Sequence, residues 1–292
     1  MSILLTGAGG FLGQAVQAQA GDRKISAIDL IPSHNGSWQA VDIRSSGIDS
    51  ALPENLDEVI HLAAIANDRA CRENPIDAWD INVGAAIRLY KACASRGCRT
   101  FVFASSEWVY GDSSSPDARK ESEELTLGGL GTYALSKLAA EFALKQVEQE
   151  SCKLLVFRLG ILFGRRTSGL SAVESVARAV ASNEAVVVQS AETARCYLHV
   201  EDAATAMLHA CDAGLRGVYN LAGDQLISLG DVYRAACDLT GNRPGLSESR
   251  PEACTVRNLD SNALRGIFGW RPQHFSSGLR DVIAAKEVPA SP

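Results

Sequence analysis

Short apolar runs alternate with longer amphipathic segments along the first 160 residues. The short runs are rich in β-branched residues, as buried strands are, and they are Ile3–Leu5, Ile25–Ile28, Val59–Leu62, Phe101–Ala104 and Leu154–Leu159. The longer segments place apolar residues three and four apart, as helices do, and they are Phe11–Ala20, Ile76–Ser95 and Tyr133–Glu150. Each is long enough to connect two parallel strands. This alternation predicts an α/β fold with a doubly wound parallel sheet, the Rossmann fold.

The alternation becomes less regular after about residue 165. The pattern there predicts a helix over Leu170–Ala181, a strand over Val186–Val188 and a helix over Glu201–Ala213. A turn-rich stretch, Thr240–Ser249, leads to a tail with one strand and two short helices. We therefore expect a first domain over residues 1–165 and a smaller C-terminal α/β lobe over 166–292, with some elements interleaved between them.

Composition and charge narrow the function classes. The chain has 292 residues, of which 46% are hydrophobic and 21% charged, as in globular proteins. A net charge of −6 disfavours nucleic-acid binding. Neither a signal peptide nor a long apolar run is evident, so we expect a cytoplasmic protein with no membrane contact. The eight cysteines are scattered, which predicts buried free thiols and no metal site.

A glycine-rich turn follows the first predicted strand directly, with a G-x-x-G-x-x-G spacing. The first glycine allows a tight turn, the second lets backbone N–H groups approach a pyrophosphate, and the third lets the helix pack closely on the sheet. The amino end of that helix carries a partial positive charge. The residues predicted to bind a dinucleotide here are Gly7, Gly10, Phe11, Leu12 and Gly13. An ordinary strand-to-helix turn is the alternative.

The end of the second predicted strand indicates which dinucleotide binds. Asp29 lies there, about 20 residues beyond the glycines, where a carboxylate accepts hydrogen bonds from the adenosine ribose hydroxyls. The same charge would repel a 2′-phosphate, and the next four residues, Leu30–Ser33, include no Arg or Lys. NAD is therefore favoured over NADP, although Asp29 could also be a simple loop residue.

A Y-x-x-x-K spacing opens the third predicted helix. Tyr133 and Lys137 would lie one turn apart on one face of that helix. A lysine ammonium beside a phenol favours the phenolate and lowers the tyrosine pKa from about 10. The strand before it ends in Ala104-Ser105-Ser106, whose hydroxyl could hydrogen-bond the same substrate oxygen. Solvent-facing helix residues are the alternative for the pair.

Together with further motifs, these residues resemble the extended short-chain dehydrogenase/reductase superfamily, in particular its NAD-dependent sugar-nucleotide epimerase/dehydratase family. The motifs are TGAGGFLG at 6–13, Asp29, Val41–Ile43, HLAA at 61–64, Asn82, Ala104–Ser106, Val109–Gly111, YALSK at 133–137, RCYLHVED at 195–202, Tyr219–Leu221 and FGWRP at 268–272. The resemblance covers nearly the whole chain. It implies an enzyme with NAD as cofactor and a substrate-binding C-terminal lobe.

The resemblance also implies roles for single residues. Tyr133 would be the general acid or base, Lys137 would bind the nicotinamide ribose, and Ser106 would hold the reacting oxygen. Further residues implied to contact the dinucleotide are Asp42, Ile43, Leu62, Ala63, Ala64, Asn82, Ala104 and Ser105.

The implied partners are a nucleotide sugar and a second copy of the chain. Arg195 and Arg250 resemble arginines that grip the sugar nucleotide's diphosphate, a chemistry that guanidinium groups suit; salt bridges are the alternative for both. The helices over Ile76–Ser95 and Tyr133–Glu150 would form the interface of a homodimer.

The chain departs from the family's patterns at two places. Ile161 stands where many sugar-nucleotide enzymes have the asparagine of R-x-x-N-x-x-G, which removes one polar substrate contact. Glu107 falls one position before the catalytic acid of the dehydratases, and Trp108 takes that acid's place, so elimination of water is not favoured. Glu107 could contact substrate as an extra acid or base, but a solvated loop carboxylate is the preferred interpretation.

Two histidines lie in apolar, strand-like surroundings. We expect His61 and His199 to be hydrogen-bonded core residues rather than catalytic groups.

Three functions remain open. The first is an NAD-dependent epimerase that oxidises a nucleoside diphosphate sugar to a transient ketone and reduces it on the other face. The second is a net dehydrogenase or ketone reductase acting on a free sugar, a sugar acid or another small alcohol. The third is a non-catalytic NAD-sensing protein on the same fold, which the presence of Tyr133 and Lys137 disfavours.

Overall fold

The computed structural model describes residues 1–45, 47–166 and 168–284. Residues 46, 167 and 285–292 lie outside this description, and all of them except residue 46 belong to the predicted lobe 166–292. The chain divides into two compact units. The first unit contains Met1–Gly111, Glu124–Leu159 and Ala204–Tyr219, and the second contains Asp112–Glu123, Gly160–Ala203 and the chain from Asn220 onward. The domain boundary at residue 165 stays a prediction.

A seven-stranded sheet carries the first unit. Its strand order is β12-β7-β5-β4-β1-β2-β3, and the pairs from β3 to β7 are all parallel. The strands are β1 (Ser2–Thr6), β2 (Lys24–Asp29), β3 (Gln39–Ala40), β4 (Glu58–His61), β5 (Thr100–Ser106), β7 (Lys153–Leu159) and β12 (Gly217–Leu221). The order reverses between β1 and β4, and ligands of such sheets bind beyond the strand ends at that point. The predicted doubly wound fold is confirmed.

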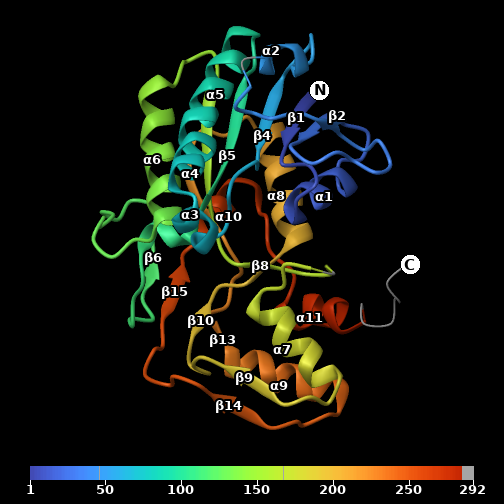
Figure 1. The fold of residues 1–292 in the computed structure, drawn as a ribbon, viewed down its shortest axis with the longest axis vertical. Coiled ribbons are helices and arrows are strands. Elements are labelled where there is room, and N and C mark those ends of the chain that lie inside the picture. The colour runs from blue at the N-terminus through green and yellow to red at the C-terminus, as the bar shows by residue number, and fades with distance from the viewer. Residues whose placement is uncertain (46, 167, 285–292) are drawn as a thin grey trace. The chain divides into compact units, whose positions relative to one another are not determined.

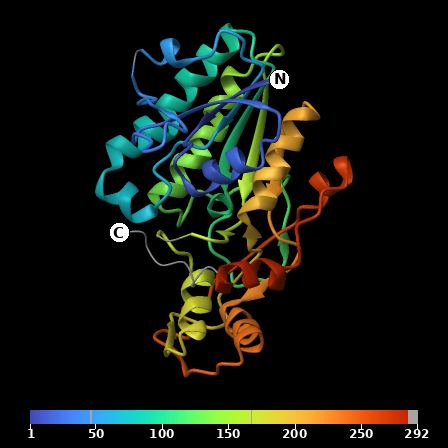
Figure 2. The same ribbon diagram turned by 90° about the vertical axis from the view of Figure 1, so that its right-hand side faces the viewer.

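Helices cover both faces of this sheet. In Figure 1, α3 (Asp68–Glu73), α4 (Pro75–Trp79), α5 (Ala86–Ser95) and α6 (Thr132–Val147) lie on one side. On the other side lie α1 (Phe11–Ala18) and α8 (Val200–Asp212), and the turned view in Figure 2 shows the same arrangement. The helix α2 (Ile48–Ala51) lies in the connection between β3 and β4. The face under α5 and α6 is sealed by a core that includes Leu89, Tyr90, Phe101 and Leu144.

The predicted helix over Ile76–Ser95 is interrupted in the structure. Between α4 and α5 the chain forms a π-helix, Asp80–Ala85, which contains one more residue per turn than an α-helix. The hydrophobic period continues through the segment, so the pattern alone predicts one unbroken helix. The buried amide of Asn82 lies within this π-helix.

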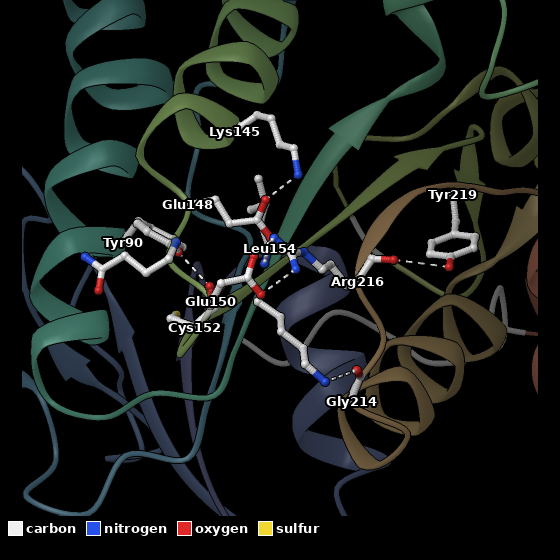
Figure 3. Close-up of polar contacts among 11 residues, drawn as sticks. Tyr90, Lys145, Glu148, Glu150, Cys152, Leu154, Gly214, Arg216 and Tyr219 are labelled. Atoms are coloured by element: carbon white, nitrogen blue, oxygen red, sulfur yellow. Dashed lines mark hydrogen bonds and ion pairs between the residues drawn. The ribbon is translucent and has the colours of Figure 1, made fainter.

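The helix predicted over Tyr133–Glu150 ends at Val147, because the residues that follow are bound in a polar cluster (Figure 3). Glu148 receives hydrogen bonds from Lys145, Leu154 and Arg216. Burial alone would raise the pKa of Glu148, but these donors together lower it. Glu150 also forms an ion pair with Arg216, at 2.9 Å. With both glutamates bound in this way, the chain leaves the helix and enters β7.

The second unit contains smaller sheets and its own helices. A four-stranded sheet has the order β13-β10-β15-β6, and two pairs, β11-β8 and β14-β9, complete the strands. The strands are β6 (Ala118–Arg119), β8 (Leu162–Phe163), β9 (Val186–Val188), β10 (Ala194–Arg195), β11 (Leu198–His199), β13 (Ile227–Ser228), β14 (Leu246–Glu248) and β15 (Val256–Leu259). The helices are α7 (Ala172–Ala181), α9 (Leu229–Thr240), α10 (Asn262–Phe268) and α11 (Phe275–Ala284).

Local signals explain the starts of α7 and α9. Each begins with a capping box, Ser171 with Glu174 and Ser228 with Asp231. Their apolar faces, with those of α11 and β9, form one core. The strand β14 lies inside the predicted turn-rich stretch, because its three residues pair with β9 some 60 positions upstream and carry little signal of their own.

All eight cysteines are free, and seven of them are buried. Among the described residues, no helix is long and apolar enough to span a membrane. Within the same ranges, no group of three His, Cys, Asp or Glu side chains could hold a metal ion.

Candidate active site

The glycine turn between β1 and α1 has room for glycine alone at two positions. Gly7 adopts a φ of +72°, and a Cβ atom there would lie 2.7 Å from the backbone nitrogen of Ala63. A Cβ atom on Gly13 would overlap the Gly7 carbonyl and lie 2.8 Å from the Cα atom of Ala8. Such contacts are too short for real side chains, so the turn folds this closely only because these residues are glycines.

The amino end of α1 suits an anion. The helix starts at Phe11, and its N-cap, Gly10, provides no side-chain hydrogen bond. The first turn, which includes Leu12, contains no acidic residue. By contrast, α7 and α9 are closed by capping boxes. A helix start without its own cap can direct its N–H groups at a phosphate, so the turn fits the pyrophosphate of NAD.

Asp29 connects the end of β2 to this turn. One carboxylate oxygen accepts a hydrogen bond from the Gly9 backbone nitrogen at 2.9 Å, and the other accepts from Ile31 at 3.1 Å. Asp42 lies further along and is bound by the Arg44 guanidinium at 2.8 Å, which lowers the pKa of Asp42. Its neighbour Ile43 is buried. Both aspartates are therefore held in place by the chain itself.

The carboxyl end of β4 lies beside the glycine turn. The Thr6 hydroxyl accepts a hydrogen bond from the Ala63 backbone nitrogen at 3.2 Å. Leu62, Ala63 and Ala64 are all half-buried. Asn82 accepts from the Ile65 backbone nitrogen at 2.9 Å and donates to the Ser136 hydroxyl, also at 2.9 Å. The amide of Asn82 thus joins the loop after β4 to α6.

Tyr133 and Lys137 lie one turn apart on α6, as predicted. Lys137 is buried, and its ammonium donates a hydrogen bond to the Ala104 carbonyl at 2.8 Å. It lies 4.9 Å from the centre of the Phe103 ring. Burial lowers the pKa of Lys137 to about 8. This lysine therefore begins to lose its charge at a pH only slightly above neutral.

The protein's own groups raise the pKa of Tyr133 rather than lowering it. Burial is the largest cause and brings the pKa to about 12, while a hydrogen bond with Ser106 acts in the opposite direction. The charges of Cys71 and Glu107 raise it further. Ser106 also accepts a hydrogen bond from the Trp108 backbone nitrogen at 3.3 Å. The lowering that the sequence analysis expected from Lys137 is therefore not observed in the chain alone, where the net shift is upward.

A buried network behind the site escaped the sequence analysis. Glu141, one turn after Lys137, forms an ion pair of 2.8 Å with Arg158 of β7, and both side chains are 6% exposed. Ser105 donates its hydroxyl hydrogen bond to Glu141. Arg158 also donates to the Tyr110 hydroxyl at 3.0 Å. These contacts use the Ser105 side chain and fix α6 against the ends of β5 and β7.

Glu107 is fully buried, and the interpretation as a solvated loop carboxylate is therefore wrong. It begins a 3₁₀ helix, Glu107–Tyr110, whose N-cap is Ser106. The short helix turns the side chain inward next to Tyr133, where its charge acts on the tyrosine pKa. The sequence pattern of a loop after a strand gave no signal of this burial.

The predicted diphosphate arginines lie in the second unit. Arg195 is 8% exposed and donates to the carbonyl and hydroxyl of Thr255, each at 2.7 Å. Arg250 is exposed. A third arginine, Arg257, is 6% exposed and stands in register with Arg195 on the neighbouring parallel strand. Arg257 forms an ion pair with Asp112. Nothing in the sequence pattern distinguishes Arg257, because the pairing of β10 with β15 is non-local.

The two histidines are buried core residues, as expected. His61 faces the Thr6 hydroxyl at 2.7 Å, and burial lowers the pKa of His61 to about 3. His199 packs edge-on against Phe163. Neither ring nitrogen of His199 has a hydrogen-bond partner among the described residues, so the expectation of a hydrogen-bonded His199 is wrong.

Comparison with known proteins is consistent with this geometry. Residues 3–222 match the model of the NAD dependent epimerase/dehydratase family. A dTDP-4-dehydrorhamnose reductase of Mycobacterium tuberculosis is 29% identical over 97% of this chain and 92% of its own. Among solved structures, MoeE5 in complex with UDP-glucose and NAD is 25% identical over 98% of both chains, with a TM-score of 0.84. The NAD complex of Thermus thermophilus UDP-glucose 4-epimerase has a TM-score of 0.86 at 24% identity, over 99% of this chain and 100% of the other. The chain is therefore an NAD-dependent enzyme of the extended short-chain dehydrogenase/reductase type and belongs to the NAD dependent epimerase/dehydratase family.

Proposed function

We propose that the protein interconverts a hydroxyl group and a ketone on the sugar of a nucleoside diphosphate sugar. The observation that carries this proposal is the arrangement at the end of β5. There the Tyr133 phenol is hydrogen-bonded to Ser106, with the buried Lys137 one helical turn away. A phenol and a hydroxyl that share one hydrogen bond can both reach a single substrate oxygen.

In the oxidising direction Tyr133 removes the proton of the substrate hydroxyl, and Ser106 holds the oxygen. Bound NAD supplies the hydride acceptor and, when oxidised, a positive charge. Lys137 adds its ammonium charge, and its hydrogen bond to Ala104 fixes where that charge lies. Because the pKa of Tyr133 is about 12 in the chain alone, with Lys137 already present, the further positive charge of the oxidised cofactor would be needed to make the phenolate accessible near neutral pH. In the reducing direction Tyr133 returns the proton to the oxygen.

The diphosphate is assigned to arginines of the second unit. Arg195 and Arg257 are both buried and in register on neighbouring strands, about 5 Å apart at the backbone. Two arginines in register on neighbouring strands favour a ligand with two negative charges. We therefore place Arg257, rather than the exposed Arg250, beside Arg195 in the substrate site. The UDP-sugar complex of the similar MoeE5 is consistent with this substrate class.

Epimerisation through a transient ketone is the first candidate for the overall reaction. Net reduction or dehydrogenation is the second, and two observations favour it. Ile161 replaces a polar substrate contact that many sugar-nucleotide enzymes have. Several nearly full-length relatives are named as reductases, including a GDP-6-deoxy-D-mannose reductase of Pseudomonas aeruginosa at 26% identity.

The amount and redox state of NAD released from the denatured purified protein tests the two reactions. An epimerase must retain its cofactor through the cycle, so near-stoichiometric NAD favours epimerisation. Little retained NAD, together with binding of added NAD, favours the net reaction. A Tyr133→Phe variant is the matched control, because it should retain as much NAD as the native protein but lose turnover. Full turnover by that variant would contradict the proposed role of Tyr133.

We also propose that the protein is a homodimer through α4 and α6. Three large apolar side chains on these helices are exposed in the single chain: Ile76 by 84%, Trp79 by 42% and Phe142 by 61%. Exposed apolar side chains that cluster on adjacent helices are typical of protein interfaces. Sedimentation of the native protein and of Phe142→Arg tests this, since a dimer should dissociate in the variant. A native monomer would refute it.

A further inference from the structure

The catalytic helix α6 does not cap its own amino end. Its N-cap residue is Gly131, which provides no side-chain hydrogen bond. Instead, the carboxylate of Asp68 accepts a hydrogen bond from the Tyr133 backbone nitrogen at 3.1 Å. Asp68 belongs to α3, more than 60 residues earlier in the chain, and its side chain is 14% exposed. A side chain that caps a helix usually comes from the N-cap position itself.

Gly131 and Asp68 depend on each other sterically. A Cβ atom on Gly131 would overlap the Asp68 carboxylate and lie 2.9 Å from its Cγ atom. The backbone of Gly131 has a φ of −72°, which any residue can adopt. Glycine is therefore required here to make space for the carboxylate of Asp68 and not for backbone freedom.

The carbonyl of Tyr133 is held as well. The Ser136 hydroxyl donates a hydrogen bond to it at 2.8 Å and accepts one from the Asn82 side-chain amide at 2.9 Å. Arg72, which is 63% exposed, forms an ion pair of 2.7 Å with the other carboxylate oxygen of Asp68, and such an exposed ion pair contributes little to holding the carboxylate in place. Asp68 thus holds the backbone N–H of Tyr133, and Ser136, supported by Asn82, holds its backbone carbonyl.

We infer that Asp68 is a positioning residue, which caps α6 and fixes Tyr133 where its phenol meets Ser106. The inference rests on the proposed role of Tyr133 as acid and base. Asp68 acts through its acceptor oxygen on the backbone and does not touch substrate. A small displacement of a catalytic group is enough to slow a reaction strongly.

The first test compares Asp68→Ala, Asp68→Asn and the control Arg72→Ala in NAD-loaded protein, with UDP-glucose as the probe substrate. Asp68→Ala should lower kcat by roughly tenfold or more, with KM within about threefold. It should also accelerate amide hydrogen exchange in the first turn of α6 by roughly tenfold, because that turn loses its cap. Asp68→Asn should retain most of kcat, since an amide oxygen still accepts the bond. Arg72→Ala should resemble the native protein.

The second test exchanges one cap for the other. Gly131→Ser in the native background should lower kcat, because the new side chain collides with Asp68. In the Asp68→Ala background the same substitution has space and provides an N-cap hydroxyl. It should therefore restore kcat and slow exchange at least threefold relative to Asp68→Ala alone.

The inference is overturned if Asp68→Ala keeps native kcat and exchange rates, or if Gly131→Ser fails to rescue it. A variant that exchanges faster but keeps native kcat also overturns it, since the cap would then be structural only. A native protein that leaves UDP-glucose unchanged counts against the proposed function. In that case the amide exchange rates of Asp68→Ala, and their restoration by Gly131→Ser, alone decide whether Asp68 caps α6.

Discussion

Arg257 lies in register with Arg195 on adjacent parallel strands, and both side chains are almost fully buried. Like charges on neighbouring strands are destabilising unless something compensates them. Asp112 forms an ion pair with Arg257, and the Asp112 side chain is 61% exposed. In the proposed function the diphosphate of the substrate is a further anionic partner of this arginine pair.

This arrangement predicts unequal effects of two arginine substitutions. Arg257→Gln should weaken the binding of UDP by roughly tenfold to a hundredfold, because a charge-assisted hydrogen bond contributes about 1.5–3 kcal/mol. Arg250→Gln removes an exposed side chain and should change the Kd less than about threefold. Calorimetric titration of both variants with UDP measures this. If the order is reversed, Arg250 is the phosphate ligand and the pairing with Arg195 has no role in binding.

The buried lysine predicts a conflict between stability and activity. The pKa of Lys137 falls from 10.5 in water to about 8, so the unfolded chain binds more protons than the native one between these pH values. Stability should rise with pH across that window, and the cost of burying the charge is fully present below it. At pH 7 the free energy of unfolding of Lys137→Met should therefore be about 1–2 kcal/mol higher than that of the native protein. Its turnover should nevertheless be at least tenfold slower. Urea unfolding at pH 7 measures the first effect, and the gain should disappear near pH 10.5.

The neutral His61 predicts sensitivity to acid. Its pKa is about 3 in the folded chain against 6.5 in water, so the unfolded state takes up a proton that the native state refuses between these values. Stability must then fall as the pH drops below 6.5. Between pH 7.5 and 5.5 the native protein should lose about 1.4 kcal/mol more than His61→Asn, which does not titrate. Equal losses in the two proteins would mean that His61 is protonated in the fold.

The ion pair between Glu141 and Arg158 predicts non-additive substitutions. Either Glu141→Leu or Arg158→Met alone leaves a buried charge without its partner, which should lower the free energy of unfolding by about 3–5 kcal/mol. The double variant removes both charges and should lose less than either single one. Guanidinium unfolding of the three variants provides the cycle. Additive losses would show that the two side chains do not stabilise each other.

Signals local in the chain predicted part of the site. The glycine turn, Asp29 and the Y-x-x-x-K spacing each lie within a single turn or helix. A pattern over neighbouring residues can specify such local geometry, and the structure has these residues in the expected turn, strand end and helix. Asp68, Asn82 and Arg257 act across 54 to 65 positions or across a strand pair, and no local period marks such partners. The prediction of a solvated Glu107 is wrong because burial depends on how a 3₁₀ turn directs a side chain, which polarity alone does not indicate.

Because of the π-helix at Asp80–Ala85, the number of residues between α4 and α5 determines where the side chain of Asn82 points. Deleting one residue from this segment would give a regular α-helix with better backbone geometry. Because the extra residue is taken up within the wider turn, α4 and α5 would keep nearly their present phase, while the residues inside the segment would change their direction around the helix axis. Asn82 could no longer face Ile65 and Ser136, and α6 would lose that contact. A shortened chain could therefore fold with a more regular helix and still be a poorer enzyme, although every side chain of the site is present.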